Sequence, residues 1–185
     1  MVNRVCYPMT KVPYHNVATI VVPAMTTLYP GSIVLADTYA SLGRKNYSVF
    51  AVTQPQTANL SEQMAIVING GWEMLPDGRR PEGQPDYTKY EFTAGEVVTI
   101  VFLEPKMRFQ ISFDCITGTP AVGKFLYPTD QAYLLTEGDA VPAATFSSFK
   151  VLALMDFGLG GQAGAQFAST VVAMVQQPTL AVDPD

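Results

Sequence analysis

One short glycine-rich stretch contains residues of the kind that handle nucleotides. "DFGLGGQAGAQF", residues 156–167, begins with Asp156-Phe157-Gly158, the metal-binding triplet of protein kinases, and continues with closely spaced glycines. A dinucleotide fingerprint needs the glycine turn to open a helix inside a βαβ unit of about 30 residues, and the segment after Gly164 is too short for one. The sequence also lacks a kinase glycine-rich lid and a His-Arg-Asp loop. We therefore predict a hairpin loop between two core strands.

The sequence offers few groups for proton transfer or metal binding. His15 is the single histidine and lies beside a proline in "KVPYHNV", where a surface or interfacial role is expected rather than catalysis. One histidine and two distant cysteines, Cys6 and Cys115, cannot supply the four ligands of a usual zinc site. Because no export signal is visible, both cysteines are expected to be reduced and buried. We predict no catalytic residue, no metal and no cofactor.

Carboxylates remain as a route to glycoside chemistry or calcium binding. Glu137 and Asp139 flank a glycine, and further acids lie in the charged stretch 74–90. No spacing among them matches a calcium loop. We interpret them as solvated turn residues.

A sugar-binding platform is the alternative hypothesis. Trp72 is followed directly by Glu73, and Tyr87 lies in the loop that follows. An aromatic face beside a carboxylate suits stacking combined with hydrogen bonding, so these residues would serve a carbohydrate- or receptor-binding β-sandwich. Trp72 as a core or interface anchor is the competing interpretation.

Composition limits the partners. The formal net charge is -5 and the pI is about 4.8, which argues against nucleic acid, because affinity for phosphates depends on concentrated lysine and arginine. No apolar stretch approaches the roughly 20 residues that span a bilayer, so no membrane partner is expected. Apolar residues make up 48% and charged residues only 15% of the chain, against a usual charged share of about 25%. Such a chain folds around a large core or covers part of its surface with partners.

The pattern of apolar runs predicts an all-β fold. The runs are short, rich in Val, Ile, Phe and Tyr, and separated by Gly, Pro and Asn. We expect an antiparallel β-barrel or sandwich with an extended N-terminal arm and long loops. The expected strands are residues 17–22, 33–37, 47–53, 64–68, 97–103, 109–113, 123–127, 146–157 and 167–175.

The last of these strands has an open alternative. Within residues 165–177, Phe167, Val171 and Met174 would also line one face of a helix. The run Ser169-Thr170-Val171-Val172 is β-branched enough to favour extension, so we predict a strand.

Three similar stretches lead into strands: "YPGSIV", "TAGEVV" and "TEGDAV". Each places a glycine in a turn before an apolar run, where glycine permits a positive φ.

We expect an arm at residues 1–16, one β-rich domain at 17–177 and a tail at 178–185. The arm is punctuated by proline and contains apolar residues that no local periodicity buries. Arms of this kind are stabilised by lying on something else, often a neighbouring subunit. The residues predicted to contact a partner are Val5, Tyr7, Pro8, Met9, Val12 and Tyr14.

Several stretches together resemble a viral protein family. "YPGSIVLADT", "TAGEVVTIVFL", "AIVINGGWEML" and "TFSSFKVLALMDFGLGG" are similar in style to the small β-rich head decoration or cement proteins of tailed bacteriophages. The resemblance implies a β-barrel or β-tulip-like body, usually trimeric, that is made in the host cytoplasm. It would bind the major capsid protein on the outside of the virion and stabilise the lattice. It implies no catalytic residue.

Overall fold

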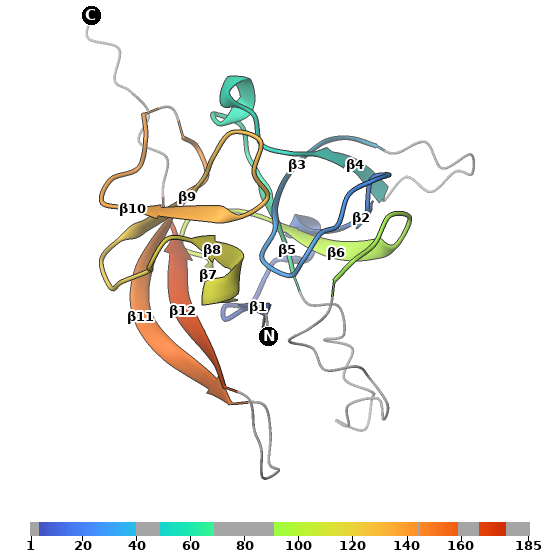
Figure 1. Ribbon diagram of the computed structural model, residues 1–185. Coiled ribbons are helices and arrows are strands. Elements are labelled where there is room, and N and C mark those ends of the chain that lie inside the picture. The colour runs from blue at the N-terminus through green and yellow to red at the C-terminus, as the bar shows by residue number, and fades with distance from the viewer. Residues whose placement is uncertain (1–3, 40–48, 69–90, 144, 159–166, 177–185) are drawn as a thin grey trace, which may run out of the picture.

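β-Strands are the main regular structure in the described part of the chain. The computed structural model describes residues 4–39, 49–68, 91–143, 145–158 and 167–176. Strands and a few short 3-10 helices make up its regular structure, which confirms the predicted all-β class. Figure 1 shows a small barrel beside a larger, strongly curved sheet.

The first half of the chain forms the barrel. Its strands close in the order β2-β4-β3-β5-β6, and neighbours are antiparallel except for the parallel pair β2 and β4. The bounds are β2 Val17–Val21, β3 Ile33–Tyr39, β4 Val49–Thr53, β5 Ala65–Val67 and β6 Val97–Phe102.

The second half forms a seven-stranded sheet together with one strand from the N-terminus. The strand order is β1-β7-β12-β11-β9-β10-β8, and only β8 and β10 pair in parallel. The long pair β11 and β12 curves through the middle of the sheet (Figure 1). The bounds are β1 Cys6–Pro8, β7 Arg108–Ser112, β8 Ile116–Thr117, β9 Phe125–Pro128, β10 Leu135–Gly138, β11 Phe149–Gly158 and β12 Phe167–Val175.

Short 3-10 helices connect some of these strands. They are η1 Tyr14–Asn16 before β2, η2 Thr57–Asn59 before β5 and η4 Phe113–Cys115 after β7.

Two hydrophobic cores lie on opposite faces of the same barrel strands. Successive side chains of a strand point to opposite faces. On β5, Ala65 and Val67 belong to the core inside the barrel, whereas Ile66 belongs to the core between barrel and sheet. Ile66 pairs with Ile33 of β3 and Val101 of β6, and this row packs toward the sheet. Burial on both faces explains why "MAIVI" is a continuous apolar run rather than an alternating one.

Aromatic residues form much of the sheet side of the shared core. Phe109 of β7 and Phe149 of β11 are fully buried and meet edge to face, with ring centroids 6.1 Å apart. Such pairs stabilise beyond the area they bury. The shared core joins the barrel and the sheet into one packed unit.

Each stretch predicted to be a strand overlaps one, and the stretch with two alternatives is a strand, β12. The prediction missed β1, β8 and β10. Each of these has at most four residues and pairs with a partner that local sequence does not indicate. Long periodic runs are read from sequence more reliably than short segments whose pairing is tertiary.

The glycine-led entries are confirmed at two positions and wrong at the third. Gly31 has φ +90° and Gly95 has φ +88°, as an entry turn requires. Gly138 is instead the last residue of β10 and pairs with Phe125 of β9. A side chain on Gly138 would collide with Tyr127, because an ideal Cβ would lie 2.7 Å from the Tyr127 hydroxyl oxygen.

The N-terminal segment packs against the body of its own chain. Cys6–Pro8 pairs antiparallel with β7, and Val5 and Cys6 are completely buried in this chain. Val5 and Ser112 lie 107 positions apart in the sequence, yet the Val5 amide donates to the Ser112 hydroxyl at 3.0 Å. Local periodicity carries no trace of so distant a partner.

We expect Ile66→Ala to lower the free energy of unfolding by about 2–5 kcal/mol, because it removes buried carbons where both halves of the molecule meet. Ile66→Val should cost about 0.5–1.5 kcal/mol, and exposed Val97→Ala less than about 0.5 kcal/mol. Urea unfolding measured by circular dichroism checks this. Two separate transitions would contradict a shared core.

The two turn glycines give a matched pair. Gly31→Ala should destabilise more than Gly95→Ala, although both have a positive φ. A Cβ at Gly31 would stand 2.7 Å from the Cys115 sulfur, whereas nothing lies within 4 Å of one at Gly95. We expect Gly95→Ala to lower the free energy of unfolding by about 1 kcal/mol through backbone strain, and Gly31→Ala to lower it by clearly more. Equal melting temperatures for the two variants would refute the close packing at Gly31.

Candidate interaction surface

The glycine-rich stretch joins two antiparallel strands. β11 ends at Gly158 and β12 begins at Phe167, and these two residues are paired across the strands. A dinucleotide-binding unit needs parallel strands connected by a helix. The antiparallel pairing therefore rules out that interpretation and agrees with the predicted hairpin. Residues 159–166 lie outside the described residues.

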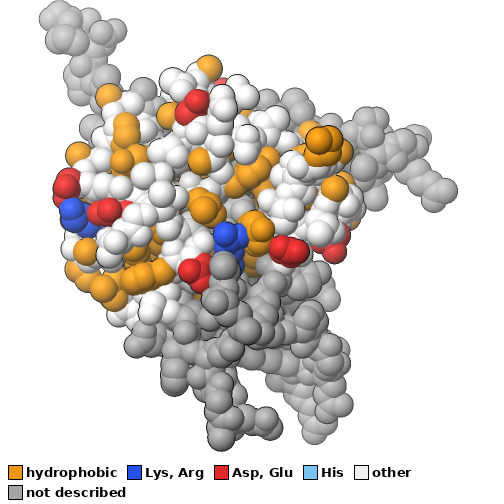
Figure 2. All heavy atoms as spheres, viewed as in Figure 1, with side chains coloured by type: hydrophobic (Ala, Val, Ile, Leu, Met, Phe, Trp, Pro, Cys, Tyr) orange, Lys and Arg blue, Asp and Glu red, His pale blue; other side chains and the backbone are white. Residues whose placement is uncertain are grey.

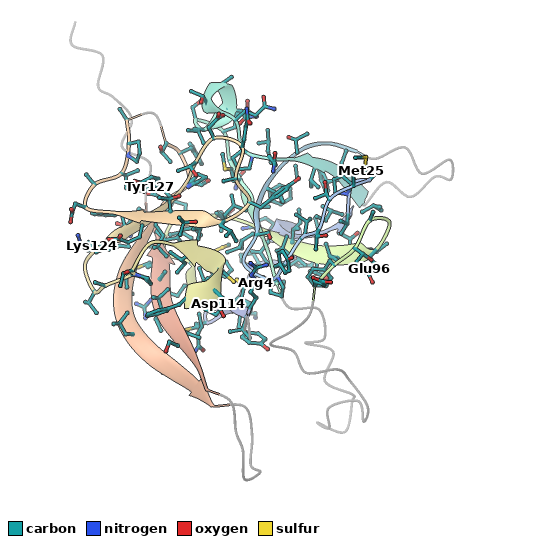
Figure 3. The ribbon with its side chains drawn as sticks, in the orientation of Figure 1. Arg4, Met25, Glu96, Asp114, Lys124 and Tyr127 are labelled. Atoms are coloured by element: carbon teal, nitrogen blue, oxygen red, sulfur yellow. The ribbon has the colours of Figure 1, made fainter. Side chains whose placement is uncertain are left out.

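Several contacts anchor the N-terminal segment to the body. The Arg4 guanidinium lies over the Tyr29 ring, 3.5 Å from its centroid, and Arg4 Nε donates to the Asp114 carbonyl at 3.1 Å. Figure 3 shows Arg4 and Asp114 side by side. Further along, the Met9 amide donates to the Arg108 carbonyl at 2.7 Å. These contacts fix the position from which the following residues face solvent.

The residues predicted to contact a partner separate into three groups. Val5 is a core residue, so the prediction that it contacts a partner is wrong. Val12 is half-buried against the shared core. Tyr7 and Pro8 are half-buried in β1. Met9 and Tyr14 are exposed, Tyr14 to 95%.

Met9, Tyr14 and Val17 are the exposed apolar side chains of the N-terminal segment and of the strand start that follows it, and we call them together the N-terminal surface. Val17, at the start of β2, is 40% exposed on the outer side of the barrel, and sequence reasoning assigned it only to a strand. His15, which follows Tyr14, faces Glu104, and its Nε2 lies 3.8 Å from Glu104 Oε1. The His15 side chain is largely exposed. This agrees with the expected surface role of His15. An almost fully exposed tyrosine suits a protein contact.

Both cysteines are free and buried, as expected. The Cys115 thiol donates to the Pro30 carbonyl at 2.9 Å and lies 3.2 Å from the Ser112 hydroxyl. Burial raises the pKa of Cys115 from 9.0 to about 12, although the Ser112 hydroxyl opposes this change. Burial also raises the pKa of Cys6, and the nearby Cys115 adds to the effect. Neither sulfur is a thiolate nucleophile near neutral pH.

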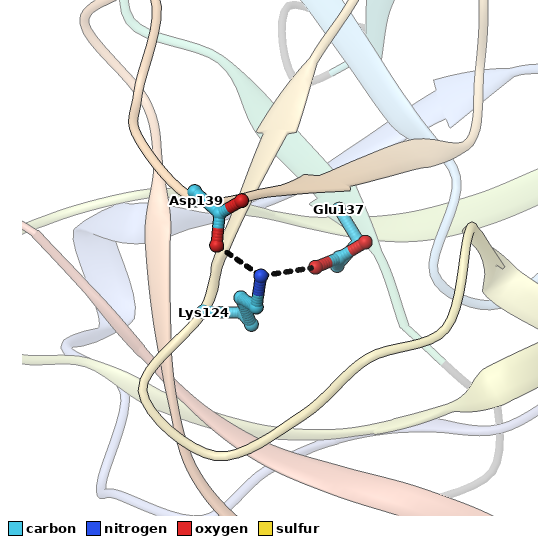
Figure 4. Close-up of polar contacts among 3 residues, drawn as sticks. All are labelled: Lys124, Glu137 and Asp139. Atoms are coloured by element: carbon cyan, nitrogen blue, oxygen red, sulfur yellow. Dashed lines mark hydrogen bonds and ion pairs between the residues drawn. The ribbon is translucent and has the colours of Figure 1, made fainter.

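The carboxylates of "TEGD" are held by a lysine. Lys124 Nζ is hydrogen-bonded to Asp139 and lies 3.7 Å from Glu137 Oε1 (Figure 4). The hydrogen bond to Asp139 is the main reason that the pKa of Lys124 is raised. Asp139 is a solvated turn residue as predicted, but Glu137 lies within β10 with a side chain only 18% exposed. The cluster fastens the turn before β9 to the end of β10.

The residues of the sugar-binding hypothesis, Trp72, Glu73 and Tyr87, lie outside the described residues.

Across residues 4–39, 49–68, 91–143, 145–158 and 167–176, no three histidine, cysteine or acidic side chains gather as metal ligands. Among the same residues, no helix has the length and apolar character to cross a bilayer.

Other exposed apolar residues were not singled out from the sequence. Met25 is fully exposed with φ +59°, and Val97 is 62% exposed. Val97 and Val98 are adjacent in "VVTIVF", and only the barrel decides that Val98 points inward. The exposed group also contains Val122, Leu154 and Met155.

Comparison of the chain with protein-family models, with curated proteins and with solved structures finds no match.

The buried thiols should resist labelling and make the fold sensitive to alkali. Ellman's reagent at pH 8 should modify both cysteines in urea and neither in the native protein. A pKa that is higher in the folded than in the unfolded state stabilises the fold below pH 9.0, and this stabilisation is lost as the pH rises toward 12.

Cys115→Ser, which keeps a donor for Pro30, should therefore reduce the alkaline loss of stability, by about 1.4 kcal/mol per pH unit inside that window. Chemical unfolding at several pH values checks this. Identical slopes for the variant and the natural protein would contradict it.

Proposed function

We propose that this protein is a non-enzymatic virion structural protein, which binds the outside of a capsid as a decoration or cement protein. The observation that carries the proposal is the N-terminal surface, where Tyr14 is 95% exposed on a segment tightly anchored to the body. An exposed aromatic on a rigid base loses little conformational entropy on binding, which favours a contact role.

The non-enzymatic part of the proposal is supported by the state of the candidate catalytic groups. Cys6 and Cys115 are buried and protonated, and Lys124 engages both Glu137 and Asp139. His15 is exposed and faces Glu104. A general base or nucleophile needs an accessible group in a site that shapes its reactivity, and none of these residues meets that condition.

The proposed partner is the major capsid protein, and the proposed form is a homo-oligomer, a trimer. A clamp on a lattice needs only moderate contacts, because symmetry repeats them, and linked contacts can raise the overall affinity by about 10² to 10⁴. The double-sided packing of β3, β5 and β6 gives a rigid body on which to mount such contacts. The proposed location is the capsid exterior, after synthesis in the host cytoplasm.

Tyr14→Ala tests the proposal directly. We expect binding to purified capsids of the encoding virus to weaken by about tenfold or more, since an exposed tyrosine of this kind is a typical interface anchor. The free energy of unfolding should change by less than about 0.5 kcal/mol, because the side chain makes almost no contact within the chain. Co-sedimentation with capsids measures the binding, and urea unfolding measures the stability.

Val122→Ala is the matched control, because Val122 is an exposed apolar residue outside the N-terminal surface. It should bind like the natural protein. Absence of the protein from purified particles, or unchanged binding by Tyr14→Ala, would defeat the proposal.

A further inference from the structure

The outer face of the seven-stranded sheet carries a row of alternating cationic and apolar side chains. Arg108 of β7 pairs with Met174 of β12, Met174 pairs with Lys150 of β11, and Lys150 pairs with Phe125 of β9. Residues directly opposite one another in a sheet point to the same face. We call these four residues the cationic row.

This row faces away from the barrel. The next residue along each strand belongs to the core shared with the barrel, so the row itself must point outward. Those inward neighbours are Phe109, Ala173, Phe149 and Leu126. Arg108 and Lys150 are exposed, and Met174 and Phe125 are half-buried.

The two cations of the row are not neutralised by the part of the chain that the structure describes. Among those residues the ion pairs of lysine and arginine involve Lys124 only. Lys150 instead lies over the Phe125 ring, with Nζ 6.0 Å from the centroid. Exposed Lys106 lies close by, since its amide donates to the Val175 carbonyl at 2.9 Å. A positive, partly apolar strip on a protein of net charge -5 is a local reversal of charge.

A second surface has the complementary character. At the far end of the β2–β6 ladder, Val97 is exposed and pairs with Val21, and Glu96 immediately precedes it. The Val22 amide donates to the Glu96 carbonyl at 2.9 Å, which places the loop carrying Met25 beside Glu96. Glu91 is exposed two residues before Thr93, whose amide donates to Glu96 Oε2 at 2.6 Å. We call Met25, Glu91, Glu96 and Val97 the acidic barrel end.

The acidic barrel end exposes an apolar side chain, Met25, which contact with water alone does not favour. Met25 is a fully exposed, unbranched apolar side chain on a backbone with φ +59°, a conformation in which glycine, asparagine or aspartate is more favourable. Val97 is also exposed, on the outer side of the barrel. Figure 3 shows Met25 and Glu96 on the barrel side of the molecule, opposite Lys124 and Tyr127, and Figure 2 shows hydrophobic and acidic side chains exposed over that part of the surface.

We propose that the acidic barrel end of one copy of this protein docks on the cationic row of a second copy. The carboxylates of Glu91 and Glu96 meet Arg108 and Lys150, and the apolar side chains of Met25 and Val97 pack on Met174 and Phe125. The two surfaces differ and lie on different sides of the molecule, so the contact is head to tail. Such a contact closes into a ring or extends into a chain, depending on the rotation between neighbours.

Sedimentation velocity of the full chain alone tests this contact. We expect concentration-dependent self-association that weakens between about 0.1 and about 1 M salt, as the Debye length falls from about 10 Å to about 3 Å. Arg108→Glu with Lys150→Glu should weaken the association by about tenfold or more. Glu91→Lys with Glu96→Gln should have a similar effect, and glutamine keeps an acceptor for the Thr93 amide.

The four substitutions combined in one chain should restore association in part, because the row then carries two negative charges and the barrel end one positive charge. This restoration also shows that the variants fold. Glu62→Lys, a charge change at an exposed residue outside both surfaces, is the control and should associate normally.

A monomer at every concentration would overturn the proposal, as would a four-substitution variant that stays dissociated while retaining its circular dichroism. Binding of a labelled single-stranded oligonucleotide that is lost in Arg108→Glu with Lys150→Glu would also overturn it, by assigning the row to nucleic acid. No capsid is present in these experiments, so their outcome is independent of the proposed virion role.

Discussion

Burial of β3, β5 and β6 on both faces is the constraint on which the rest of the structure depends. One face of these strands fills the barrel, and the other packs on the curved sheet. At β5 the two cores are separated by the thickness of a single strand, since Ala65 and Val67 point one way and Ile66 points the other. Hydrophobic burial on both sides ties barrel and sheet together more firmly than a polar contact between two separate domains would.

This packing has a consequence for function. The largest side chains of the shared core, among them Phe109, Phe149 and Ile111, meet in close contact between the two sheets. The cysteines lie in the same core, where a hydrogen atom in place of a side chain at Gly31 makes room for the Cys115 sulfur. Thiols placed in such surroundings are neutral and shielded. The features that a partner can contact are at the surface: exposed aromatic and apolar residues and the distribution of charge.

The surface is organised by the same framework. β7 holds β1 on one side and β12 on the other, so it positions both Met9 and the cationic row. Tyr14 and Val17 lie instead on η1 and β2, and the acidic barrel end lies on the barrel. The proposed decoration role needs a contact with a shell and, in an oligomer, a contact with a second copy, and the contacts that we propose for them use the N-terminal surface, the cationic row and the acidic barrel end.

The sequence by itself determined the secondary structure class and most strands, because hydrophobic periodicity is a local property. It predicted β12 correctly from a β-branched run and placed positive φ angles at Gly31 and Gly95. Only the tertiary structure decided that Val5 is a core residue while Tyr14 is exposed, that Glu137 is held by Lys124, and that Arg108 and Lys150 share one row. These outcomes depend on strand partners far apart along the chain, and the pattern of a single strand does not record which strand will lie beside it.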